Sequence, residues 1–215
     1  MIKNNYDPIA DNYDWLSTIV FGQSLVNAQT CLLTHIAAGS NVLIVGGGTG
    51  WILSEIAKIH ASGLTITYVE ISQKMIVLAK KHDVKNNEMF FENKAIEEFK
   101  SDEKYDIIFT AFLFDNFKSE KIETVFLHLN NLLKSDGKWL FADFHIEHNS
   151  QPWQKLLLKS MLFFFRVVCN IEARNLVAID PFFLRNGFKK SVAYSHYRGF
   201  IESSVYQRAR FDMKN

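Results

Sequence analysis

The chain alternates continuous apolar runs with segments in which apolar residues return every three or four positions. The apolar and β-branched runs predict strands at 41–47, 64–70, 88–93, 105–114 and 137–144. The periodic segments predict helices at 51–61, 72–82 and 122–133, and Ser72 is a suitable N-cap for the second. Strands that alternate with helices favour a mostly parallel sheet covered on both faces, as in a Rossmann-like doubly wound α/β fold.

The last part of the chain has a different pattern. Two strand-like runs, 189–197 and 200–211, are joined at Arg198 and Gly199, which predicts an antiparallel hairpin at one end of the sheet. We therefore expect a seven-stranded sheet with a C-terminal antiparallel hairpin, in a single domain over 1–215.

Composition narrows the class of protein. The 215 residues are 48% hydrophobic, which suits one folded domain, and the net charge of +1 argues against a nucleic-acid partner. Cys31 and Cys169 have neither metal-ligand nor disulfide spacing. The N-terminus does not resemble a secretory signal, and Lys159 and Arg166 interrupt the most apolar stretch. We expect a cytoplasmic protein that does not insert stably into a membrane. The sequence is compatible with peripheral contact with a membrane surface.

A glycine-rich loop follows the first predicted strand. Gly46, Gly48 and Gly50 let the backbone turn sharply and let a ligand approach, and the next helix directs its N-terminus at the same place. A dinucleotide fingerprint would need glycine where Trp51 stands, which disfavours a nicotinamide cofactor. Glu70 ends the second strand and can accept hydrogen bonds from ribose hydroxyls. A ribosylated ligand at the carboxyl ends of the strands is therefore expected.

Around these residues the sequence resembles the class I S-adenosylmethionine-dependent methyltransferases. "VLIVGGGTG" and "YVEISQKMI" resemble the motifs of the family's first two strands, and "KYDIIFTAFLFD" and "LLKSDGKWLFADF" resemble those of strands four and five. The N-terminal "YDPIADNYDWL" is similar to small-molecule members of ubiquinone and menaquinone biosynthesis. The resemblance implies S-adenosylmethionine as cofactor. It also implies four segments along the chain: a helical cover at 1–38, a cofactor-binding core at 41–145, a helical specificity insertion at 150–187 and the terminal hairpin at 188–211.

The resemblance also implies a set of cofactor-binding residues. The glycine loop would hold the methionine end, Glu70 the ribose and Ile71 the adenine, while Tyr6 and Tyr13 would belong to the cover. The expected cofactor-binding residues are Tyr13, Gly46, Gly47, Gly48, Thr49, Gly50, Glu70, Ile71, Lys94, Ala95, Ile96, Thr110 and Ala111. Ile44 and Lys94 stand where the family usually has acidic residues, so a degenerate, non-catalytic member is an alternative.

A methyl acceptor that must lose a proton requires a base. Candidates after the fifth strand are Asp143, His145, Glu147 and His148, of which His145 and His148 have the most suitable intrinsic pKa values and are the predicted catalytic residues. Asp115, beyond the fourth strand, is a weaker candidate. No metal site is expected, because neighbouring side chains directly after a strand point apart.

The apolar segment after Pro152 either packs as core or roofs a pocket for a lipophilic acceptor with Phe163, Phe164 and Phe165. We predict methyl transfer from S-adenosylmethionine to a small, apolar or aromatic molecule. An NAD(P)-dependent oxidoreductase and a non-catalytic binding or interaction protein are the alternatives. The identity of the acceptor, the atom methylated and the oligomeric state stay open.

Overall fold

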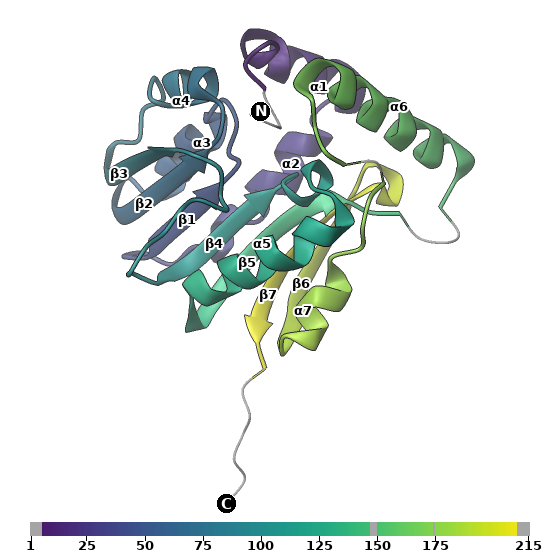
Figure 1. Cartoon of the computed structure of the whole chain (residues 1–215). Helices are drawn as coiled ribbons and strands as arrows, with labels where there is room; N and C mark the ends of the chain where they lie inside the picture. Colours follow the sequence, from purple (N-terminus) through teal and green to yellow (C-terminus); the bar gives the residue numbers. More distant parts are fainter. Residues whose placement is uncertain (1–5, 147–149, 174, 210–215) are drawn as a thin grey trace, which may run out of the picture.

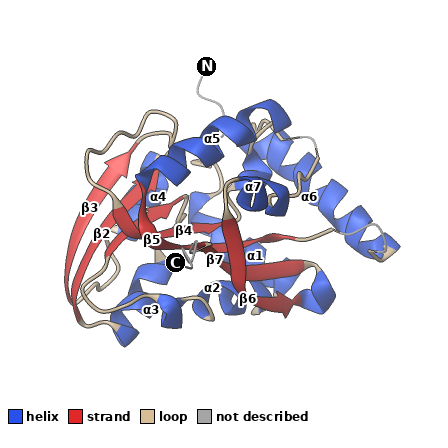
Figure 2. Ribbon diagram, turned by 90° about the horizontal axis from the view of Figure 1, so that it is seen from below, coloured by secondary structure: helices blue, strands red, loops and turns tan. Residues whose placement is uncertain are grey.

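One sheet of seven strands runs through the molecule (Figures 1 and 2). The computed structural model describes residues 6–146, 150–173 and 175–209, and within them the strand order is β3-β2-β1-β4-β5-β7-β6. The strands are β1 Asn41–Val45, β2 Ser62–Glu70, β3 Asn86–Asn93, β4 Tyr105–Ala111, β5 Leu133–Phe144, β6 Phe188–His196 and β7 Ile201–Arg208. β1 to β5 pair in parallel, and β7 lies antiparallel between β5 and β6. The predicted doubly wound sheet with its terminal hairpin is confirmed.

Helices cover both faces of this sheet. The helices are α1 Tyr13–Phe21, α2 Ser24–Thr30, α3 Trp51–Ile59, α4 Gln73–Ala79, α5 Ser119–Leu132, α6 Pro152–Cys169 and α7 Asp180–Arg185. α2 and α3 lie on one side of the sheet, and α5 and α7 on the other (Figure 2). Side chains alternate between the faces of a strand, so Ile44 packs in the core that contains α3, and Leu43 and Val45 pack in the core that contains α5.

A third apolar cluster lies over the carboxyl ends of the strands. It joins Phe21 of α1 and Leu158, Met161 and Leu162 of α6 to Phe144, the last residue of β5. Figure 1 shows α1 and α6 at the top of the molecule, above this edge of the sheet. The segment after Pro152 therefore buries part of its apolar surface against α1 and the strand ends rather than against a face of the sheet.

The fourth strand is shorter than its apolar sequence predicts. β4 ends at Ala111, because Phe112 adopts a left-handed φ of 52° and turns the chain into the 3-10 turn η3, Phe114–Asn116. The N–H of Phe112 donates a 2.8 Å hydrogen bond to the carbonyl of Ala142. Such a backbone is uncommon for a bulky side chain, and strained residues of this kind cluster at functional sites.

Candidate active site

A cavity of about 820 Å³, called here the main cavity, lies where β1, β2 and β4 end. Its lining includes eleven of the thirteen cofactor-binding residues predicted from the sequence: Tyr13, Gly46, Gly47, Gly48, Thr49, Glu70, Ile71, Lys94, Ala95, Ile96 and Ala111. Gly50 and Thr110 are not among its lining residues. The structure thus brings together segments that are far apart in the sequence, at the edge where an open α/β sheet binds ligands.

The glycines of the loop after β1 have different roles. Gly46, Gly48 and Gly50 all have positive φ, between 65° and 86°. A Cβ on Gly50 would lie 2.5 Å from the Cα of Ala79, so this glycine allows α3 and α4 to pack closely. A Cβ on Gly47 would lie 2.5 Å from the ring of Tyr68. On the lining of the cavity, Gly46 and Gly48 therefore present bare backbone in a conformation that L side chains rarely adopt.

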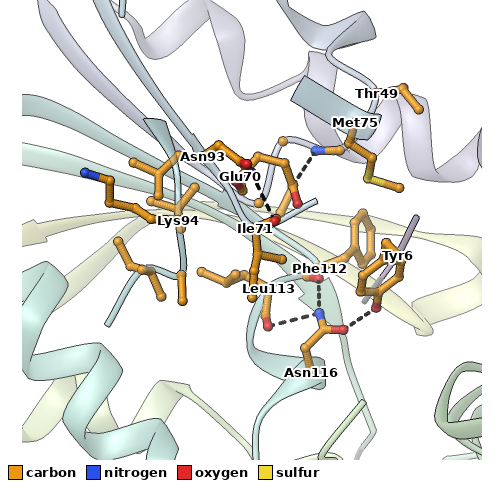
Figure 3. Close-up of a pocket in the computed structure, with 18 of the residues that line it drawn as sticks. Tyr6, Thr49, Glu70, Ile71, Met75, Asn93, Lys94, Phe112, Leu113 and Asn116 are labelled. Atoms are coloured by element: carbon orange, nitrogen blue, oxygen red, sulfur yellow. Dashed lines mark hydrogen bonds between the residues drawn. The ribbon is translucent and has the colours of Figure 1, made fainter. Parts of the chain in front are cut away.

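Glu70 is buried at the end of β2 and holds the loops on either side of it (Figure 3). Its carboxylate accepts hydrogen bonds from the backbone N–H of Gly48 at 3.2 Å and of Ser72 at 2.8 Å. Burial raises the pKa of this carboxyl to about 7, and the two hydrogen bonds partly oppose that rise. A buried carboxylate facing a cavity is suited to accept hydrogen bonds from ligand hydroxyls.

The loop after β3 places Asn93 and Lys94 beside Glu70. The side-chain amide nitrogen of Asn93 donates to the carbonyl oxygens of Glu70 and Ile71, at 2.9 and 3.0 Å, and so fixes the strand end. The ammonium of Lys94 forms a 2.6 Å ion pair with Glu92 and points away from Glu70 (Figure 3).

Ile44, the other departure from the family pattern, has its side chain in the core on the α3 side of the sheet. The backbone of the glycine loop is instead held by Tyr68, whose hydroxyl donates a 2.9 Å hydrogen bond to the carbonyl of Gly48. Tyr68 thus links the glycine loop to β2 by a polar contact.

The N-terminal segment closes one side of the main cavity. Thr49 Oγ1 donates to the carboxylate of Asp14, with distances of 3.0 and 2.8 Å to its two oxygens, so α1 is latched to the glycine loop. The hydroxyl of Tyr6 donates to the side-chain oxygen of Asn116 (Figure 3). Neither Asp14 nor Asn116 was expected from the sequence, because no motif or spacing links them to the glycine loop.

A second cavity of about 250 Å³, called here the apolar cavity, adjoins the first. The two share the lining residues Tyr6, Tyr13, Phe112 and Asn116. The apolar cavity is lined mainly by side chains of α1 and α6, namely Leu16, Ser17, Val20, Phe21, Leu157, Ser160, Met161, Leu162, Phe164 and Phe165. Among the described residues that line it, Asp115 carries the one carboxyl group.

Asp115, in the lining of the apolar cavity, and the buried Asp143 form a pair of interacting carboxyl groups. Asp143 Oδ1 accepts a 2.8 Å hydrogen bond from the backbone N–H of the next residue, Phe144. Asp143 Oδ2 has no hydrogen-bond partner within the described residues. Burial raises the pKa of Asp143 to about 7; burial and the charge of Asp143 together hold the pKa of Asp115 well above its usual range. Such a pair can hold a shared proton near neutral pH.

Of the two predicted catalytic histidines, His145 lies within the described residues. His145 directly follows β5, where its N–H donates to the carbonyl of Phe200 at 2.8 Å, and it is not among the described lining of either cavity. His148 lies outside the described residues. Thr110, expected near the cofactor, is fully buried and accepts a 2.9 Å hydrogen bond from Trp139 Nε1. Direct roles of these residues stay predictions.

Comparison with known proteins supports a methyltransferase domain. Residues 42–137 match a family model described as a methyltransferase domain, whereas no curated protein sequence matches the chain. Among solved structures, a mitomycin 7-O-methyltransferase superposes with a TM-score of 0.66 at 14% identity over 93% of this chain. This chain spans 58% of that enzyme's length.

Two further structures cover most of both chains. Magnesium protoporphyrin IX methyltransferase from Synechocystis, solved with S-adenosylhomocysteine, gives a TM-score of 0.63 at 16% identity and covers 87% of this chain and 83% of its own. A chain from the Haloferax volcanii complex of a Trm112 activator with a putative methyltransferase gives 0.69 at 15% identity, with coverage of 98% and 100%. At these identities the likeness shows the fold, not the substrate.

Proposed function

We propose that this chain, which has the class I methyltransferase fold and a matching domain at residues 42–137, transfers a methyl group from S-adenosylmethionine to a small apolar or aromatic acceptor. The observation that carries the proposal is the pair of adjoining cavities. The main cavity has the polar lining that a nucleoside needs, and the apolar cavity meets it at Tyr6, Tyr13, Phe112 and Asn116. Donor and acceptor would therefore meet at the shared wall, where orientation alone can contribute roughly 7–11 kcal/mol.

The described residues fit the cofactor. Glu70 would accept hydrogen bonds from the ribose hydroxyls, and Ile71 and Ile96 would pack against the adenine. The bare backbone at Gly46 and Gly48 leaves room for the methionine end. S-adenosylmethionine supplies a methyl group already activated by a sulfonium, so the protein's task is to orient the acceptor and take up its proton.

Asp115 is the residue that we assign to this proton transfer. Its carboxyl lies in the lining of the apolar cavity next in sequence to Asn116. Burial and the charge of Asp143 raise the pKa of Asp115, so its ionised form binds a proton more strongly than a solvent-exposed carboxylate does. Asn116 Nδ2 donates to Asp115 Oδ1 at 2.9 Å and also to the carbonyl of Phe112, which fixes the direction of the carboxyl. An acceptor with a protic nitrogen or oxygen on an apolar body suits this arrangement.

The test is a calorimetric titration of the cofactor-free protein with S-adenosylmethionine, S-adenosylhomocysteine and NADH in parallel. We expect micromolar binding of both adenosyl ligands and none of NADH. Glu70→Ala should weaken binding at least tenfold, about 1.4 kcal/mol. The matched control is Glu88→Ala, an exposed carboxylate of β3 outside the cavity lining, which should bind as the wild type does.

Binding of NADH alone would support the oxidoreductase, and binding of none of the three would support the non-catalytic alternative. After adenosyl binding is shown, release of S-adenosylhomocysteine in the presence of a panel of apolar phenols and amines identifies the acceptor class. An unchanged turnover in Asp115→Asn would remove Asp115 from the proton transfer.

A further inference from the structure

Helix α6 leaves large apolar side chains in contact with solvent. Leu156, Phe163 and Val167 are 68%, 61% and 67% exposed. They are separated by seven and four residues, so at 3.6 residues per turn they form one stripe along the helix. Contiguous apolar surface of this kind usually marks a place of contact with another molecule.

A basic stripe runs beside the apolar one. Lys155, Lys159 and Arg166 are separated by four and seven residues and lie about 80° around the helix from the exposed apolar stripe. The sequence of α6 contains no acidic residue. Exposed aromatic and aliphatic side chains flanked by cations are the pattern of a helix that lies on an anionic lipid surface.

Helix α1 adds to the same surface. Trp15 and Ile19 are one turn apart and are 66% and 59% exposed, while Leu16 and Val20, on the adjacent face of the helix, line the apolar cavity. Both helices lie together at the top of the molecule in Figure 1.

Two residues of α6 belong both to the lining of the apolar cavity and to the surface of the helix. Ser160 and Phe164 of α6 line the cavity and are themselves exposed. They lie around the helix between the exposed stripe of Leu156, Phe163 and Val167 and the buried face. The lining of the apolar cavity is therefore continuous around α6 with the exposed apolar side chains.

We propose that α1 and α6 dock on the surface of an anionic lipid bilayer, with the mouth of the apolar cavity facing the lipid. A second copy of the chain is less suited to this surface when the two α6 helices pack antiparallel about a two-fold axis, because both basic stripes would then lie on the same side of the interface. Within the described residues no helix is long and apolar enough to span a membrane, so the contact is a surface one.

Docking would let a lipophilic acceptor pass from the bilayer into the cavity. That consequence rests on the proposed methyl transfer, whereas the docking itself does not. The two are separable by experiment, because lipid binding and cofactor binding are measured independently.

The experiment is co-sedimentation of the full chain with vesicles of phosphatidylcholine alone, or mixed with phosphatidylglycerol. We expect binding to the mixed vesicles that salt weakens. The double variant Phe163→Ser with Val167→Ser should lower vesicle affinity at least tenfold, because two exposed apolar anchors are lost. Its matched control, Val77→Ser with Leu184→Ser, removes exposed apolar side chains from α4 and α7 and should bind as the wild type does.

The charges are tested in the same way. The double variant Lys159→Gln with Arg166→Gln should lower the affinity for mixed vesicles about fivefold for each charge removed. The control, Lys81→Gln with Lys189→Gln, removes two exposed lysines elsewhere and should bind as the wild type does. Equal binding to neutral and mixed vesicles, or equal losses in the matched controls, overturns the proposal. So does a wild-type dimer in light scattering that Phe163→Ser with Val167→Ser dissociates.

Affinity for S-adenosylhomocysteine is measured on the same proteins. Loss of vesicle binding with unchanged cofactor affinity shows that the variants are folded and supports docking. Vesicle binding by a chain that does not bind the cofactor would overturn the proposed function and leave the docking standing.

Discussion

The backbone N–H of Gly48 donates a hydrogen bond of 3.2 Å to the carboxylate of Glu70, and so ties the loop after β1 to the end of β2. The other carboxylate oxygen of Glu70 accepts from the N–H of Ser72, the N-cap residue of α4. One buried carboxylate therefore fixes the glycine loop and the start of the next helix while still lining the main cavity.

This arrangement predicts a pH dependence of cofactor binding. The pKa of Glu70 is raised to about 7 by burial, and ribose hydroxyls would donate to its ionised form. Affinity for S-adenosylhomocysteine should therefore fall about tenfold between about pH 8 and about pH 6, measured by calorimetry. Glu70→Gln should bind more weakly and lose most of this dependence. The same pH profile in wild type and Glu70→Gln would contradict the assignment.

The tight contact at Gly50 predicts a large loss of stability on substitution. Gly50→Ala combines a left-handed φ of 86° with a Cβ placed 2.5 Å from Ala79, and should destabilise the fold by about 2–5 kcal/mol in urea unfolding. Gly63→Ala is the matched control, since Gly63 has a φ of 87° but no atom within 4 Å of the added Cβ. It should lose only about 1–2 kcal/mol. Equal losses would show that backbone strain alone explains both.

The carboxyl pair predicts that stability falls with rising pH. A carboxyl whose folded pKa is raised stabilises the fold below its unfolded pKa, and this contribution is lost as pH rises to the folded value. For Asp143 that range is from 3.8 to about 7. Each such proton contributes a slope of up to about 1.4 kcal/mol per pH unit.

Urea unfolding at several pH values in this range measures the effect. Asp143→Asn should flatten the decline, both because its own carboxyl is gone and because its charge no longer raises the pKa of Asp115. Asp106→Asn is the control, because the pKa of Asp106 is lowered by the hydrogen bond from Lys134 and its contribution has the opposite sign. A slope unchanged in Asp143→Asn would refute the shared proton.

The hydrogen bond between Thr49 and Asp14 predicts that α1 becomes more mobile when this bond is removed. Thr49→Val keeps the shape of the side chain but removes the donor to Asp14, so amide hydrogen exchange in α1 should become about tenfold faster. The control is Thr18→Val. The hydroxyl of Thr18 donates a hydrogen bond to the backbone carbonyl of Asp14, within α1 itself. Its removal should leave the latch to the glycine loop intact. Equal exchange in both variants would mean that the latch does not hold α1.

Local sequence was sufficient for the elements whose formation depends on local chemistry. Apolar runs between polar segments predicted the positions of the strands, Ser72 was recognised as a helix cap, and its side chain accepts from the N–H of Met75. Glycines directly after a strand, followed by an acidic residue at the end of the next strand, located the main cavity. In each case neighbouring residues carry the signal, because strand, cap and tight turn each form within a few residues.

Other features had no local signal. The sequence "TAFLF" continues an apolar strand, yet the chain turns at Phe112. The N–H of Phe112 bonds to the carbonyl of Ala142, and β5 continues beyond the end of β4 to Phe144, where it pairs with β7. The approach of Asp115 to Asp143 depends on this turn. Sequence reasoning favoured the histidines after β5 on intrinsic pKa, with Asp143 as a further candidate there and Asp115 beyond β4 as a weaker one. Burial in the folded chain raises the pKa of these two aspartates, which intrinsic pKa values do not show.

The sequence by itself therefore determined the alternation of strands and helices, the glycine loop and the carboxylate at the end of β2. Only the tertiary structure decided that Asp14 latches the cover, that Tyr68 holds the glycine loop, and that Asp115 lines an apolar cavity. The physical reason is that burial and long-range hydrogen bonding depend on which segments the sheet brings together. Hydrophobic periodicity records which face of a segment is buried, but not which partner it meets there.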